Sequence, residues 1–278
     1  MASAPALLPI PTPAPTPTPA PAPNDTSVEL LDRPATQEFV AATRGEPIRI
    51  RYDAGQNRYE IKTAAFDWSA LLDPPDPSGG QPNSYFNVAG QPTGWFGILA
   101  QHRSPDPDRK YRYSNLASWK AASRSADVER DFVAFGAPTP ASGIPLTGGA
   151  SFVGFASGTA DVPNDGWGPI AATPLDGTVR LNFDFGAGAL SGSLGLASAC
   201  DCVTNFSLGT LSFTNTVFAR GGQTFSGSFA SAATGANAFA GRFTGPAAEE
   251  LIGSWTVPFL FEGATHQASG AWIAKRGN

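Results

Sequence analysis

The chain has 278 residues, which is enough for one large domain or two modest ones. Its 31 glycines and 26 prolines, set against only 15% charged residues, predict turn-rich β structure and argue against long helices. The net charge of -5 disfavours nucleic acid as a partner, and no apolar run reaches the roughly 18 residues of a membrane-spanning helix.

The N-terminal segment, residues 1–27, alternates proline with alanine and threonine over much of its length. Such a sequence favours an extended polyproline conformation and buries nothing, so we expect a stalk outside the folded part. Pro9 to Pro23 would span roughly 45 Å at about 3.1 Å per residue, enough to lift a domain away from an anchor. A generic disordered tail has the same composition and is the alternative.

Residues 28–136 are expected to form a small β-rich subdomain. Isoleucine and tyrosine alternate with arginine over 48–52, and a second alternating strand follows at 59–62, which predicts a hairpin with one apolar and one charged face. Proline and glycine dominate 73–82 and predict a loop, whereas 111–119 has the pattern of a strand. A hinge rich in proline and glycine then leads into the second part.

Residues 137–278 show short alternating strands separated by glycine-rich turns, which predicts eight antiparallel strands closed into an up-and-down barrel. The apolar positions switch from even to odd numbers between Leu208 and Leu211, so we expect a bulge at Gly209–Thr210 to restore the inward face. The predicted strands lie near 149–159, 178–185, 189–196, 206–213, 216–229 in part, 238–244, 250–261 and 266–275.

A short repeat, F-x-G-x-F, occurs at 225–229 and 239–243. It places two phenylalanines on one face, and the glycine between them leaves room where strands bend or rings cross. An eight-stranded barrel is just wide enough to be filled by side chains, so we expect inward phenylalanine and leucine to occupy the interior. The predicted fold class is therefore all-β: a small β-rich handle subdomain followed by an eight-stranded antiparallel up-and-down barrel.

Cys200 and Cys202 lie two residues apart on a predicted turn between barrel strands. We expect a disulfide that stiffens the loop; separate reduced thiols and a thiolate metal site are the alternatives. Two thiolates are too few for a zinc site, and His102 and His266 lie far away in sequence, so no metal site is predicted.

Two groups of aromatic residues are candidates for binding a ligand or a partner. Trp167 lies in a loop between the first two barrel strands, where it would be either a binding anchor or a lid over the open barrel end. In the handle, Trp95 and Phe96 stand between two glycines and precede a basic pair. That pair is His102 and Arg103, and burial within the handle is the alternative role of the two aromatic residues.

Motifs that would identify an enzyme are missing from the sequence. It holds neither G-x-S-x-G nor H-E-x-x-H, and its glycine runs lack the lysine of a phosphate loop. We therefore predict no enzymatic activity, no catalytic residue and no cofactor. Function is expected to come from surfaces that recognise a ligand or a partner.

Three stretches carry a resemblance to a known family: FGAPTP from Phe135, PLTGGASFVG from Pro145, and FAGRFTGPAAEELIGSW from Phe239. They resemble the transferrin-binding protein B-like barrel proteins, over about residues 111–276. The resemblance implies a lobe made of a handle and an eight-stranded barrel. It also implies a lipoprotein of the Gram-negative outer membrane, surface-exposed or on the periplasmic face, that captures an iron source for a TonB-dependent receptor.

On this resemblance we expect a monomeric, non-catalytic binding protein whose ligand is haem, a haemoprotein or another iron carrier. The chain has residues for one lobe, whereas true transferrin binders have two, so transferrin itself is not implied. In the family the stalk follows an acylated cysteine; since no cysteine precedes Cys200, we expect this form of the chain to lack its lipid anchor. A lipocalin-like carrier of a small apolar ligand and an adhesion or interaction module are the alternative functions.

Overall fold

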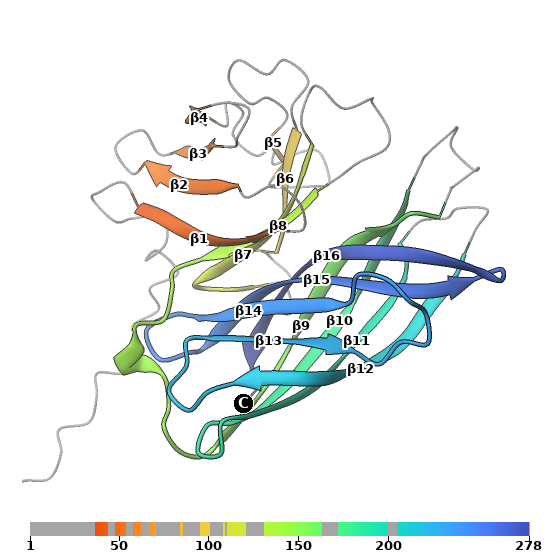
Figure 1. The fold of residues 1–278 in the computed structure, drawn as a ribbon. Helices are drawn as coiled ribbons and strands as arrows, with labels where there is room; N and C mark the ends of the chain where they lie inside the picture. Colours follow the sequence, from red (N-terminus) through yellow and green to blue (C-terminus); the bar gives the residue numbers. More distant parts are fainter. Residues whose placement is uncertain are drawn as a thin grey trace, which may run out of the picture.

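The computed structural model describes residues 37–43, 48–53, 58–62, 67–70, 84–85, 95–100, 108, 110–120, 131–162, 172–199 and 205–277. Over these residues the chain is all-β, with one 3-10 turn, Ala141–Gly143, between its two halves. The first eight strands form one sheet and the last eight a closed antiparallel barrel, and the sheet lies across the outside of the barrel (Figure 1). The predicted fold class, a β-rich handle followed by an eight-stranded up-and-down barrel, is confirmed.

The handle sheet consists of β1 (Gln37–Thr43), β2 (Arg49–Asp53), β3 (Arg58–Lys62), β4 (Ser69–Ala70), β5 (Ser84–Tyr85), β6 (Trp95–Ala100), β7 (Ser114–Lys120) and β8 (Asp131–Gly136). Their order is β4-β3-β2-β1-β8-β7-β6-β5, and neighbours are antiparallel. β2 and β3 confirm the predicted hairpin: Ile50 faces Ile61, and both side chains are fully buried. On the other face Arg51 pairs with Glu60 at 2.5 Å, as the alternation predicts.

The apolar run in β8 is continuous because this strand is buried on both faces. Val133 and Phe135 point into the core of the handle. Phe132 and Ala134 point the other way and belong to a second buried cluster, which they share with Ile273 on the outside of the barrel. A strand covered on both sides shows an unbroken apolar sequence instead of an alternating one. β8 is therefore the central contact between the handle and the barrel.

The barrel consists of β9 (Gly149–Ala160), β10 (Thr173–Asp184), β11 (Ala189–Ser198), β12 (Ser207–Phe218), β13 (Thr224–Phe229), β14 (Ala238–Thr244), β15 (Glu250–Phe261) and β16 (Ala264–Arg276). Each strand pairs with the next one in the chain, and β16 pairs with β9 to close the sheet. The predicted bulge is present one residue earlier than expected: the pairing with β11 skips Leu208. Gly209 beside it has φ +69°, a conformation that glycine adopts without strain.

One predicted strand boundary is wrong. The sequence indicates separate strands at 206–213 and from 216 onward, whereas β12 runs unbroken to Phe218. The pairing of β12 with β13 shifts between Thr214 and Val217, and Asn215 has φ +47°. This second irregularity changes the alternation without ending the strand, because a bulge alters which face a residue occupies while the ladder continues.

Aromatic rings fill the barrel, as the sequence predicts. The Phe183 ring lies 4.8 Å from that of Phe243 and 5.0 Å from that of Phe218, measured between centroids. A second layer surrounds the fully buried Trp272, whose ring lies 5.6 Å from that of Phe239. The interior is thus a packed core, which is the expected state of an eight-stranded barrel.

The two F-x-G-x-F segments interlock across β13 and β14. Phe225 faces Gly241, and Gly227 faces Phe239. A Cβ added at Gly227 would lie 2.5 Å from the Phe239 ring, and one added at Gly241 would collide with the Phe225 ring. Each glycine is therefore needed to make room for the phenylalanine of the other segment.

Candidate functional site

One end of the barrel gathers four connections between strands: β9 to β10, β11 to β12, β13 to β14 and β15 to β16. We call this end the barrel mouth. The predicted anchor Trp167 belongs to the first connection, and Cys200 and Cys202 belong to the second. These three residues lie outside the described part of the chain, so their roles stay predictions.

The predicted handle residues also stay predictions. Trp95 and Phe96 belong to β6, where their backbone pairs with β7, but their side chains lie outside what the structure describes. His102 and Arg103 lie outside the described residues altogether.

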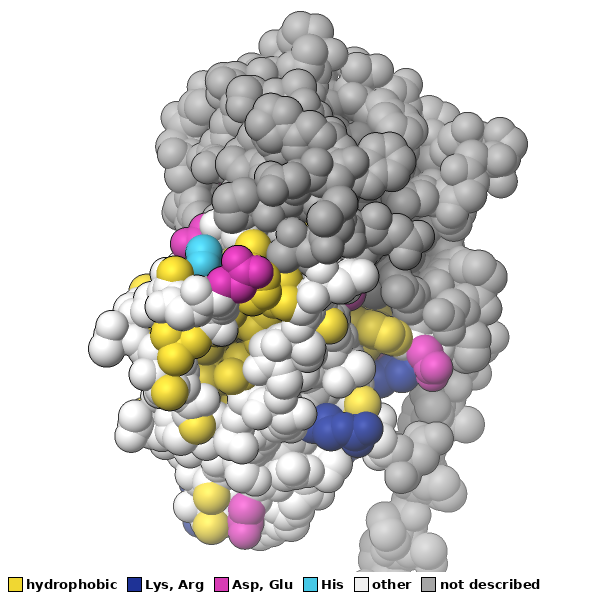
Figure 2. Space-filling model, turned by 90° about the vertical axis from the view of Figure 1, so that its right-hand side faces the viewer, with side chains coloured by type: hydrophobic (Ala, Val, Ile, Leu, Met, Phe, Trp, Pro, Cys, Tyr) yellow, Lys and Arg dark blue, Asp and Glu magenta, His cyan; other side chains and the backbone are white. Residues whose placement is uncertain are grey.

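Three phenylalanines stand at the mouth above the filled interior. Phe259 and Phe261 alternate on β15 and share its inward face, while Phe206 directly precedes β12. The Phe206 ring stacks on Phe259 with centroids 5.6 Å apart, and it lies 5.0 Å from the ring of Phe261. Phe206 and Phe261 remain partly exposed because the barrel ends here. Figure 2 shows hydrophobic side chains gathered on this face, bordered by histidine and acidic side chains.

His266 and Asp161 form a polar pair beside these rings. The His266 ring, on β16, lies 5.7 Å from the ring of Phe259 and 6.0 Å from that of Phe261. Its Nδ1 is 3.0 Å from Oδ1 of Asp161, the residue that follows β9. The same oxygen accepts the backbone N–H of Gln267 at 2.8 Å. Closure of the barrel between β9 and β16 thus brings together side chains 105 positions apart in sequence.

Sequence reasoning missed His266 as a residue of the mouth. The signal that could have found it is the dipeptide Glu262–Gly263, since glycine between two alternating runs favours a two-residue hairpin turn. The structure confirms this turn, in which both residues have positive φ, of 50° and 79°. Counting outward from this turn places His266 opposite Phe259 in the β15–β16 hairpin. Asp161 has no such local signal, because its position beside His266 depends on barrel closure.

A hollow of about 540 Å³ lies between the handle and the outside of the barrel. β1 forms one side of it through Ala41 and neighbouring residues. The other side carries a row of small residues on three adjacent strands, Ser226, Ala240 and Ser254, with Arg242 beside them. A guanidinium next to hydroxyl groups is suited to hold a small anionic group.

A buried carboxylate holds the handle on the barrel. Glu250, at the start of β15, is only 5% exposed and accepts the backbone N–H groups of Arg112 at 2.6 Å and Tyr113 at 2.9 Å. Nearby, the hydroxyl oxygens of Ser114 and Thr244 lie 2.6 Å apart. Burial raises the pKa of Glu250 to about 7, although the two amide hydrogen bonds act in the opposite direction. The contact therefore contains a group that titrates near neutral pH.

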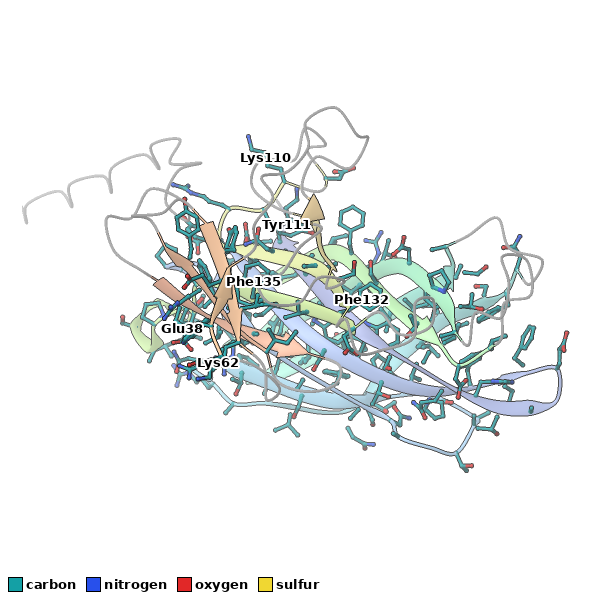
Figure 3. All side chains as sticks on the ribbon, turned by 90° about the horizontal axis from the view of Figure 1, so that it is seen from above. Glu38, Lys62, Lys110, Tyr111, Phe132 and Phe135 are labelled. Carbon is teal, nitrogen blue, oxygen red and sulfur yellow. The ribbon has the colours of Figure 1, made fainter. Side chains whose placement is uncertain are left out.

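The outer face of the handle is charged, but its charges pair with one another. Arg49 binds Glu38 through two hydrogen bonds, of 2.6 and 2.8 Å, and the bonds from Arg49 lower the pKa of Glu38. The Arg51 guanidinium lies 4.1 Å from the centre of the Trp68 ring. Figure 3 shows Glu38 together with Lys62 on this part of the handle. These described charges are therefore engaged with one another or with an aromatic ring.

No protein-family model and no curated protein matches the sequence. Solved structures do match. Transferrin-binding protein B from serogroup B Neisseria meningitidis aligns over 87% of this chain and 44% of its own, with 17% identity and a TM-score of 0.50. A mutant of transferrin-binding protein B from Haemophilus parasuis aligns over 83% of this chain and 51% of its own, with 14% identity and a TM-score of 0.45. A protein described as a surface lipoprotein aligns over 88% of this chain and 100% of its own, with 15% identity and a TM-score of 0.41.

The likeness shows the fold. At 17% identity the Neisseria protein shares with this chain a transferrin-binding protein B-like arrangement of strands. The chain spans about half the length of the transferrin-binding proteins it matches. Among the described residues there is no helix that is long and apolar enough to cross a bilayer.

Proposed function

We propose that this chain is a non-catalytic binding lipoprotein of the outer membrane that captures an iron source for a TonB-dependent receptor. The iron source would be haem, a haemoprotein or another iron carrier. The observation that carries the proposal is the aromatic mouth above the filled barrel, where Phe206 and Phe261 stay partly exposed. Rigid rings that remain accessible at the rim of a scaffold are typical of recognition sites.

The packed interior supports binding at the mouth in preference to binding inside. Phe213 and Phe239 flank the buried Trp272 with ring centroids 5.8 and 5.6 Å from its own. A lipocalin-like carrier, the alternative function, needs that space for its ligand. A ligand of this barrel is therefore expected to contact its rim and the neighbouring loops.

Location and organisation form part of the proposal. We propose a stalk over 1–27, a handle over 28–136 and a barrel over 137–278, with the stalk holding a monomeric lobe away from the membrane. The fold shared with transferrin-binding protein B of Neisseria meningitidis supports a site at the outer membrane, most simply at the cell surface. The periplasmic face is the other location compatible with a stalk of this kind.

A binding panel tests the proposal. The full chain is immobilised through its N-terminus and exposed to ferric haem, methaemoglobin, ferric transferrin and a ferric siderophore, each beside its iron-free form. Phe261→Ser removes apolar surface from the mouth, and Leu146→Ser removes a 54% exposed leucine just before β9, at the opposite end of the barrel.

We expect one cargo to bind and Phe261→Ser to lower its affinity by about tenfold or more, equivalent to about 1.4 kcal/mol. Leu146→Ser is expected to bind like the wild-type chain. Binding of no cargo, or an equal loss in both variants, contradicts the proposal.

A further inference from the structure

The pair formed by His266 and Asp161 determines which imidazole nitrogen is available to a ligand. A carboxylate oxygen only accepts hydrogen bonds, so Nδ1 of His266, 3.0 Å from Asp161 Oδ1, carries the proton. In the neutral ring, Nε2 then holds the free lone pair. Within the described part of the chain, the bond to Asp161 is the only hydrogen bond of this side chain, which is 20% exposed. His266 therefore presents a metal-binding nitrogen at the mouth.

Asp161 holds the imidazole in a fixed orientation. Histidine ligands in metal sites commonly donate their second N–H to a carboxylate, which orients the ring and makes it a stronger electron donor. Asp161 is itself anchored on β16: its Oδ1 accepts the Gln267 N–H at 2.8 Å, and its own N–H donates to the Gln267 carbonyl at 3.0 Å. The arrangement of His266 is thus set before any ligand arrives.

The surroundings of His266 decide which kind of metal group fits. The described residues contain no group of three or more His, Cys, Asp or Glu side chains that could hold a metal ion. A bare ion would find one imidazole and one carboxylate that is already engaged. An iron porphyrin brings four nitrogens of its own and requires only an axial ligand from the protein. Its flat apolar faces also suit the partly exposed ring of Phe261, which lies 6.0 Å from the imidazole.

We propose that Nε2 of His266 is the axial ligand of a haem iron bound at the barrel mouth, and that Asp161 is its positioning residue. This inference rests on the proposed function and narrows its cargo to haem. It also assigns the aromatic cluster a specific task, since the partly exposed Phe261 would pack against the porphyrin.

The sequence provides a matched control, because it contains only two histidines, His102 and His266. Ferric haem is titrated into the wild-type chain, His266→Ala and His102→Ala, and the absorption spectrum is recorded at each step. We expect a saturable shift of the Soret band in the wild type and in His102→Ala. His266→Ala is expected to lose this shift and to regain a ligated spectrum when imidazole is added, while circular dichroism shows that its fold is intact.

Asp161→Asn tests the positioning role. The amide oxygen can still accept the bond from Nδ1, but the negative charge is gone, so the imidazole donates less electron density to the iron. We expect haem to bind and the reduction potential of the iron to rise relative to the wild-type complex. An unchanged potential overturns the role given to Asp161.

The results also separate this inference from the proposed function. An unchanged spectrum in His266→Ala, or a loss confined to His102→Ala, overturns the assignment of the ligand. If the wild-type chain binds no haem but binds another iron carrier of the panel, the haem inference fails and the proposed function stands. If it binds no member of the panel, both fail.

Discussion

Replacing Glu250 with glutamine tests how the handle is held on the barrel. Burial raises the pKa of this carboxyl from an ordinary value of 4.5 to about 7. The folded state therefore binds the proton more tightly than the unfolded state, and protonation stabilises the fold. This stabilisation is fully present below about pH 4.5 and is lost as the pH rises through about 7.

The size of the effect follows from the pKa difference. A difference of about 2.5 corresponds to about 3 to 4 kcal/mol in the free energy of unfolding, at about 1.4 kcal/mol for each pH unit. Roughly 2 to 3 kcal/mol of this falls between pH 5 and pH 8. Glutamine does not titrate, so Glu250→Gln lacks this dependence. The other titrating groups are common to both proteins and largely cancel when the two are compared.

The assay is urea unfolding followed by tryptophan fluorescence, in steps between pH 5 and pH 8. We subtract the unfolding free energy of Glu250→Gln from that of the wild type. This difference is expected to fall by roughly 2 to 3 kcal/mol over this range. Glu249→Gln is the control, because it removes the neighbouring carboxylate. That carboxylate makes the smallest contribution to the pKa of Glu250, so Glu249→Gln should keep most of the pH dependence of the unfolding free energy. A difference that stays constant within about 0.5 kcal/mol would refute the reasoning.

Three further predictions concern the core, the mouth and the cysteines. Phe183→Ala removes a 3% exposed ring that is packed among other phenylalanines. It should lower the free energy of unfolding, measured in urea, by about 3–5 kcal/mol. A loss below about 1 kcal/mol would mean that the interior is loosely packed. Trp167→Ala should weaken cargo binding while the melting temperature stays nearly unchanged, and a large drop in melting temperature would instead make this residue a lid. A thiol titration of the unfolded, unreduced chain should find no free sulfhydryl if Cys200 and Cys202 are joined, and two free sulfhydryls exclude the disulfide.

Local pattern was sufficient for most of the barrel. The strand predicted at 189–196 corresponds to β11, and that at 238–244 is β14 itself. The alternation that predicts a strand has a period of two residues, and glycine marks the turns, so both signals lie within a few positions of each other. The wrong boundary in β12 arose where a bulge near Asn215 changes the alternation inside a continuous strand.

By itself, then, the sequence determined the class of fold, the existence and order of the barrel strands, and an interior filled by aromatic rings. The tertiary structure alone decided which barrel residues cover the second face of β8 and that Asp161 meets His266 at the mouth. Both outcomes depend on contacts between segments far apart in the chain, and closure of β16 on β9 is one of them. A periodic pattern shows that a residue faces inward or outward, but not which distant residue lies opposite it.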